Sequence, residues 1–120
     1  MDSFHPSEIK PLITLDTFEK VDIRVGTIEN VEDMEKSKSL VKLLVNFGDH
    51  LRIILAGLKT ERENPKEIEG RQALFVVNLP SRKMMGIESE GMLFDIGYAD
   101  SITPVLAVPE KKVPDGTKAG

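Results

Sequence analysis

Short runs in which apolar and polar residues alternate constrain this chain more than any other feature. Residues 21–25 place an apolar side chain at every second position, and residues 41–47 do the same. A period of two is that of a β-strand with one buried face, whereas a helix repeats every 3.6 residues. Further strands are expected at residues 51–55, 72–78 and 92–96, because turn-forming residues flank them. The pattern therefore predicts an all-β domain.

A short helix is expected between the third and fourth of these strands. Asn64 can cap its start, Pro65 suits the first helical position, and Gly70 suits the position just past its end. Five strands with a helix at this point match the oligonucleotide/oligosaccharide-binding (OB) fold, a partly open Greek-key barrel. Strand periodicity alone fits any small barrel, and the helix makes the prediction specific. Gly26 is expected to mark a bulge or a sharp bend in the first strand.

Extensions are predicted at both ends of the barrel. Residues 1–11 lack periodicity and indicate a loose arm, and residues 14–20 indicate one helical turn, capped by Asp16. An apolar run at 102–108 is surplus to five strands, and a second copy of the chain is its simplest partner. The length of 120 residues suits one domain. We expect a barrel core at about 18–97 and a dimerisation extension at 98–120, which together predict a homodimer.

The composition of the chain limits which ligands and reactions it can support. The chain has 16 Lys and Arg against 20 Asp and Glu, so a nucleic-acid site would have to be a local basic patch on an acidic body. Cysteine is absent, which removes disulfides and thiolate ligands and fits a cytoplasmic location. No apolar run is long enough to cross a bilayer, so no membrane partner is expected. His5 and His50 are the only histidines and neither suits catalysis, so we predict no catalytic residues, no metal, no cofactor and no enzyme activity.

Three sequence blocks carry a resemblance to a known family. They are residues 18–26, residues 56–58, and residues 70–93. The most specific spacing within them is that of Asn78, Lys83, Gly86, Ser89 and Met92. These blocks resemble the tRNA-binding domain shared by methionyl-tRNA synthetases, small dimeric tRNA-binding proteins, the endothelial monocyte-activating polypeptide and CsaA-type export chaperones. The resemblance implies an OB barrel that binds the outer corner of folded tRNA, with methionyl-tRNA synthetase as a candidate partner.

Two loops are expected to carry the ligand site. In an OB barrel the ligand lies across one face, between the loop joining strands one and two and the loop joining strands four and five. The second loop contains Arg82 and Lys83, for which the family resemblance favours a role in binding RNA. The first contains Lys36 and Lys38, although a short charge run by itself more often indicates ordinary solvated residues. Together these four cations predict a basic rim.

Four further residues are expected to contact RNA. Asn78, Ser89 and Glu90 can form hydrogen bonds with bases, ribose or phosphate, and Met85 offers a polarisable surface for a base. Each has a structural alternative: Asn78 could cap a turn, Ser89 could bond its own backbone, and Met85 could be core. Aromatic residues are only 5% of the chain, so stacking platforms are few and recognition should depend on shape and phosphate charge.

The leading hypothesis is a non-catalytic, dimeric tRNA-binding protein that acts alone or with a synthetase. The first alternative is a CsaA-like chaperone that holds extended polypeptides. The second is a purely structural dimerisation module. The salt dependence of binding distinguishes the tRNA-binding hypothesis from the chaperone alternative. Affinity for phosphates falls steeply as the salt concentration rises, and affinity for a peptide does not.

Overall fold

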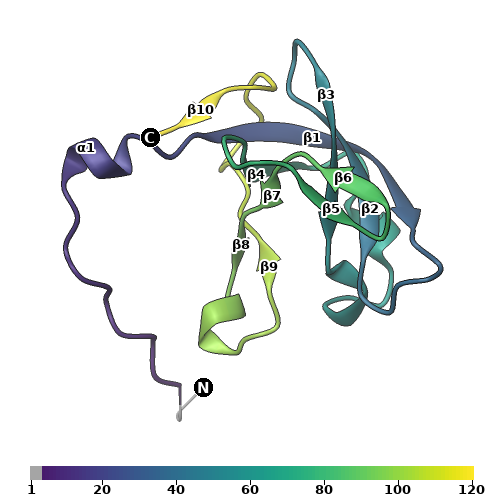
Figure 1. Cartoon of the computed structure of the whole chain (residues 1–120), viewed down its shortest axis with the longest axis horizontal. Helices are drawn as coiled ribbons and strands as arrows, with labels where there is room; N and C mark the ends of the chain where they lie inside the picture. Colours follow the sequence, from purple (N-terminus) through teal and green to yellow (C-terminus); the bar gives the residue numbers. More distant parts are fainter. Residues whose placement is uncertain (1–3) are drawn as a thin grey trace.

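The computed structural model describes residues 4–120. Its main feature is a curved antiparallel sheet (Figure 1). Five of its strands lie in the spatial order β3 (Leu51–Ala56), β2 (Val41–Asn46), β1 (Ile23–Asp33), β4 (Gln72–Val76) and β7 (Met92–Leu93). The sixth, β10 (Lys118–Ala119), pairs with the start of β1. The predicted all-β OB barrel is confirmed.

The long strand β1 allows the sheet to close. Its first half pairs with β4 and its second half with β2, so that Thr27 lies opposite both Gln72 and Asn46. At the other edge, the amide of Glu90 donates to the carbonyl of Ile53 on β3 at 2.8 Å, just before β7 begins. The two edges of the sheet therefore meet and nearly close the barrel.

Alternating side chains fill the barrel interior, as the period of two predicts. Its fully buried members come from four strands and from the 3₁₀ helices η1 (Leu58–Thr60) and η2 (Pro65–Ile68). They include Ile28, Leu43, Val45, Ile54, Ile68 and Phe75. Burying each such side chain contributes about 1.5–3 kcal/mol. The helix between the third and fourth strands is present, but it is 3₁₀ rather than α, it follows a second short 3₁₀ helix η1 (Leu58–Thr60), and the Asn64 side chain does not cap it.

Gly26 lies within β1, where an added Cβ would be 2.6 Å from Cγ1 of Val45. Glycine is needed here for close packing, and the strand continues to Asp33 through a register shift between Ile28 and Asn30. Residues 29–33 are therefore strand, and the loop to β2 begins only after Asp33.

The loop expected at 79–91 has its own structure. It folds into a hairpin of β5 (Arg82–Met84) and β6 (Ile87–Ser89). Beyond β7 the predicted fifth strand breaks, and β8 (Asp95–Ile96) pairs instead with β9 (Val105–Leu106). These two strands form a ribbon that includes the 3₁₀ helix η3 (Tyr98–Asp100) and projects from the barrel (Figure 1).

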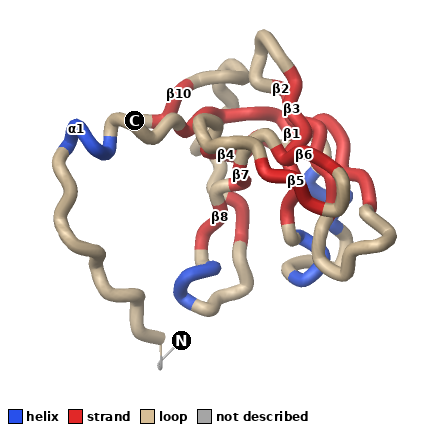
Figure 2. The backbone as a smooth tube through the Cα atoms, in the orientation of Figure 1, coloured by secondary structure: helices blue, strands red, loops and turns tan. Residues whose placement is uncertain are grey.

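The N-terminal arm runs outside the barrel as a long loop segment with one helical turn, α1 (Leu15–Phe18) (Figure 2). The cap of this turn is Thr14, whose hydroxyl accepts from the amide of Thr17 at 3.2 Å, and not Asp16. The amide of Ser7 donates to Asp100 on η3 at 2.8 Å, which tethers the arm to the ribbon. The first three residues of the predicted arm lie outside the described residues.

The C-terminal segment contributes to the barrel of its own chain. Leu106 and Ala107 are buried, and the amide of Gly116 donates to the carbonyl of Val25 at 2.7 Å. Within residues 4–120, no helix has the length and apolar character required to traverse a bilayer.

Candidate nucleic-acid interface

The β5–β6 hairpin presents three exposed residues of the predicted site, Arg82, Lys83 and Met85. Met84 pairs with Ile87, so Met85 and Gly86 alone form the turn. Their φ values are +53° and +81°, and positive φ at both central residues defines a type I′ turn, which matches the twist of a hairpin. Met85 is 52% exposed at the tip. The alternative that Met85 is a core residue does not hold.

Arg82 and Lys83 are both exposed on β5. Neither forms an ion pair with any of residues 4–120. Lys83 lies opposite Glu88 on β6. Because neighbouring strand residues point to opposite faces, these two cations flank the hairpin rather than project side by side. Both remain available to phosphate groups.

The loop between β1 and β2 lies beside this hairpin. Its Lys36 and Lys38 are exposed, and Lys36 lines the same depression as Met85. Lys59 holds this loop in place, because its Nζ donates to the carbonyls of Met34 at 2.8 Å and Ser37 at 2.7 Å. The structure therefore brings the two predicted loops together at one end of the barrel.

Asn78 and Ser89 have structural roles. The Asn78 side chain accepts from the amide of Asp22 at 2.9 Å and donates to the carbonyl of Lys20 at 2.6 Å. Ser89 is only 3% exposed; its hydroxyl accepts from the amide of Leu55 at 3.0 Å and donates to the carbonyl of Gly91 at 3.1 Å. Both residues therefore support the fold, but not in the way expected: Asn78 joins its loop to the segment before β1 instead of capping its own turn, and Ser89 bonds β3 and Gly91 instead of its own backbone. The buried Ser89 hydroxyl has no surface left for a ligand.

Glu90 is bound to β3, with its carboxylate accepting from the amide of Ile53 at 3.0 Å. Sequence reasoning missed the residue beside it, Arg52. Arg52 Nη1 donates to the carbonyls of Val77 at 2.7 Å and Glu90 at 2.9 Å, one on each side of the loop that carries the hairpin. The only sequence signal for this role is a single arginine within an apolar strand.

Comparison with known proteins assigns the family. Residues 23–118 match the family described as "Putative tRNA binding domain". The chain belongs to the tRNA-binding domain family. It is 45% identical over 110 residues to a methionine--tRNA ligase of Methanococcoides burtonii and 39% identical over 111 residues to that of Archaeoglobus fulgidus. These matches cover 90% and 92% of this chain but 16% of each ligase, so the chain spans about a sixth of their length.

Solved structures agree with this assignment. A MetRS related protein from Pyrococcus horikoshii superimposes with a TM-score of 0.84 at 34% identity, covering 92% of this chain and all of that one. The chaperone CsaA from Bacillus anthracis gives 0.79 at 26% identity, with the same coverage. The predicted family resemblance is confirmed, and both the synthetase-related and the CsaA branches are represented.

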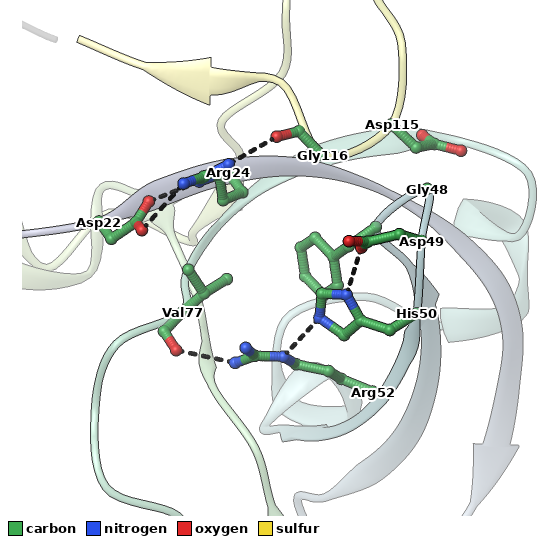
Figure 3. Close-up of a pocket in the computed structure, with 10 residues that line it drawn as sticks. Asp22, Arg24, Gly48, Asp49, His50, Arg52, Val77, Asp115 and Gly116 are labelled. Atoms are coloured by element: carbon green, nitrogen blue, oxygen red, sulfur yellow. Dashed lines mark hydrogen bonds and ion pairs between the residues drawn. The ribbon is translucent and has the colours of Figure 1, made fainter.

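The tRNA-binding domain has a second depression, of about 470 Å³, at the start of β1 and the turn between β2 and β3 (Figure 3). On one side Arg24 Nε lies 2.6 Å from Asp22, and this hydrogen bond, more than any other contact, lowers the pKa of the Asp22 carboxyl. On the other side Arg52 Nε donates to His50 Nε2 at 3.0 Å. His50 Nδ1 lies 2.6 Å from Asp49, which lowers the pKa of that carboxyl.

Three aspartates offset the two arginines around this depression. Arg24 is paired with Asp22. Arg52 has no carboxylate partner among residues 4–120, and its guanidinium lies 5.7 Å from the centre of the Phe47 ring, within cation–π range. Of the two arginines in this depression of the tRNA-binding domain, Arg52 is the one that also holds the hairpin loop, through its bonds to Val77 and Glu90.

Proposed function

We propose that this protein binds tRNA through the β5–β6 hairpin and the adjoining β1–β2 loop, without catalysis. The observation that carries the proposal is the pair of exposed cations on the hairpin, Arg82 and Lys83, which no carboxylate within residues 4–120 neutralises. Lys36 and Lys38 extend the positive charge onto the neighbouring loop. Family membership supports tRNA as the ligand.

Recognition by phosphate charge predicts a definite salt dependence. If about three to five phosphates are neutralised, the logarithm of the affinity should fall against the logarithm of the salt concentration with a slope near −2 to −4. Fluorescence anisotropy of labelled tRNA over a salt series measures this slope. A slope near zero would favour the polypeptide-holding alternative, which the likeness to CsaA keeps as the second candidate.

A homodimer is part of the proposal. Apolar side chains are exposed along the arm and on the β8–β9 ribbon, and a surface of this kind indicates an interface. The exposed fractions are 95% for Ile9, 98% for Leu12, 69% for Leu15, 56% for Ile96 and 76% for Tyr98. A second copy would bury these side chains and would place two RNA sites in one particle, which adds avidity. Light scattering after size exclusion tests this, and a monomer at micromolar concentration would contradict it.

We further propose a cytoplasmic location and methionyl-tRNA synthetase as a partner. The identity of 45% to a segment of one such ligase supports the second point, because a tRNA site near the enzyme raises the local concentration of substrate. Adding the protein to a synthetase at limiting tRNA should lower the apparent KM for tRNA. An unchanged KM would argue for a protein that acts alone.

A further inference from the structure

A depression of about 290 Å³ separates the tip of the β5–β6 hairpin from the loop that follows β1. Its apolar lining consists of Met34, Met85 and Ile87. Met85 occupies a turn position with φ +53°, where asparagine or glycine would fold more easily. An apolar, half-exposed side chain in a strained backbone position indicates that its thioether serves a purpose other than folding.

The polar rim of the same depression offers one free group of each charge. Glu32 lies 3.4 Å from Lys42, and Asp33 forms an ion pair with Lys59. Glu35 and Lys36 also line the depression and are exposed, and neither takes part in an ion pair within the described part of the chain. A ligand that fits here has a flat apolar face, a hydrogen-bond donor at one edge and a negative charge nearby.

We propose that this depression binds one unstacked nucleobase that carries an exocyclic amino group. The thioethers of Met34 and Met85 contact the face of the base, because methionine sulfur interacts favourably with aromatic rings. The Glu35 carboxylate accepts a hydrogen bond from the amino group, as acidic side chains do from cytosine N4. Lys36 is placed to contact the attached phosphate. Uracil is disfavoured, since its O4 would face a carboxylate.

This inference rests on the proposed function, because it assumes that RNA is the ligand. It adds a base preference to a site otherwise described by shape and charge. Splayed single bases are a common target of RNA-binding proteins, and a folded RNA exposes them in loops and corners.

Methionine methyl resonances test the inference directly. The chain has five methionines, so a protein labelled with ¹³C-methyl methionine gives few signals. We expect cytidine 5′-monophosphate to shift the methyl signals of Met34 and Met85 together, and uridine 5′-monophosphate to shift them less. Met92 lines a different depression and should not move. Equal shifts with both nucleotides, or unmoved Met34 and Met85 signals, would overturn the inference.

The variant Met85→Asn separates a binding role from a folding role. Asn-Gly is the preferred type I′ sequence, so the midpoint of thermal unfolding should rise by about 2–6 °C. Affinity for tRNA should nevertheless fall about 2- to 10-fold, the range of a lost sulfur–aromatic contact. A variant that keeps full affinity would refute the base site.

The double variant Arg82→Ala and Lys83→Ala distinguishes the two proposals. If it weakens tRNA binding and Met85→Asn does not, the base site fails and the tRNA function stands. If neither weakens binding, the tRNA proposal fails as well. The expected result is a loss of affinity in both variants, with higher thermal stability only in Met85→Asn.

Discussion

Two groups of polar residues in the hairpin loop differ in what their side chains contact. On β5, Arg82 and Lys83 are exposed and free of ion pairs within residues 4–120. Asn78, and Ser89 directly opposite Arg82 on β6, instead form side-chain hydrogen bonds with backbone groups of neighbouring segments. One sequence block therefore contains both the residues that build the loop and those that reach outward. A motif match alone does not distinguish them.

The largest effect is expected at Arg52, which holds both sides of the loop. Arg52→Ala removes its two bonds to carbonyl groups and its contact with Phe47, and we expect a loss of about 2–4 kcal/mol in the free energy of unfolding. Affinity for tRNA should fall too, although Arg52 contacts no RNA in our proposal. Urea denaturation and anisotropy measure the two quantities. A stable variant that no longer binds would instead make Arg52 part of the binding surface.

Ser89→Ala should cost about 1–2 kcal/mol in the free energy of unfolding, because the buried amide of Leu55 loses its acceptor. Once the protein is folded, its affinity for tRNA should remain close to that of the wild type. If affinity disappeared without any loss of stability, Ser89 would belong with the RNA-binding residues Arg82 and Lys83 despite its burial.

Arg82→Ala with Lys83→Ala should change the free energy of unfolding by less than about 0.5 kcal/mol, since both side chains are exposed. Removing two phosphate contacts should make the salt slope shallower by about 1.4. The pair Lys111→Ala and Lys112→Ala is the matched control, because it removes the same charge from two exposed residues that line a separate depression. Equal loss in both pairs would mean that net charge, not the hairpin, governs binding.

The smallest effects concern two carboxylates whose pKa values shift in opposite directions. The hydrogen bond from Arg24 lowers the pKa of Asp22, so its contribution to stability is present above the ordinary aspartate pKa and is lost as the pH falls through the lowered value. Burial, followed by the nearby Asp95, raises the pKa of Glu61, so this group favours the folded state more as the pH falls. Near pH 7, Asp22→Asn should therefore destabilise slightly and Glu61→Gln should stabilise slightly. Thermal unfolding midpoints would show the signs.

Strand periodicity predicted the barrel because it reports which face of each strand is buried, and β2 and β3 lie close to their expected positions. Shorter elements escaped prediction. The three-residue strands β5 and β6 contain too few positions to show a period, and Met85 in the turn hides the asparagine or glycine signature of a type I′ hairpin.

The site was only partly predictable for a related reason. The exposed cations could be chosen from a local motif, because chain neighbours lie together in space. Ser89, Arg52 and Asn78 each bond at least one partner that lies 25 to 58 positions away in the chain, and a single sequence does not show such contacts. Whether a polar residue serves the ligand or the fold depends on those distant partners.

The pairing of β10 with the start of β1 has a consequence for how this unit can be joined to others. Ala119 lies opposite Ile23, so the chain enters and leaves the barrel at one edge, and the hairpin lies elsewhere on the barrel (Figure 1). Another polypeptide can be attached at either terminus without crossing the hairpin. The domain can therefore be fused to a larger protein while its proposed RNA-binding surface stays exposed.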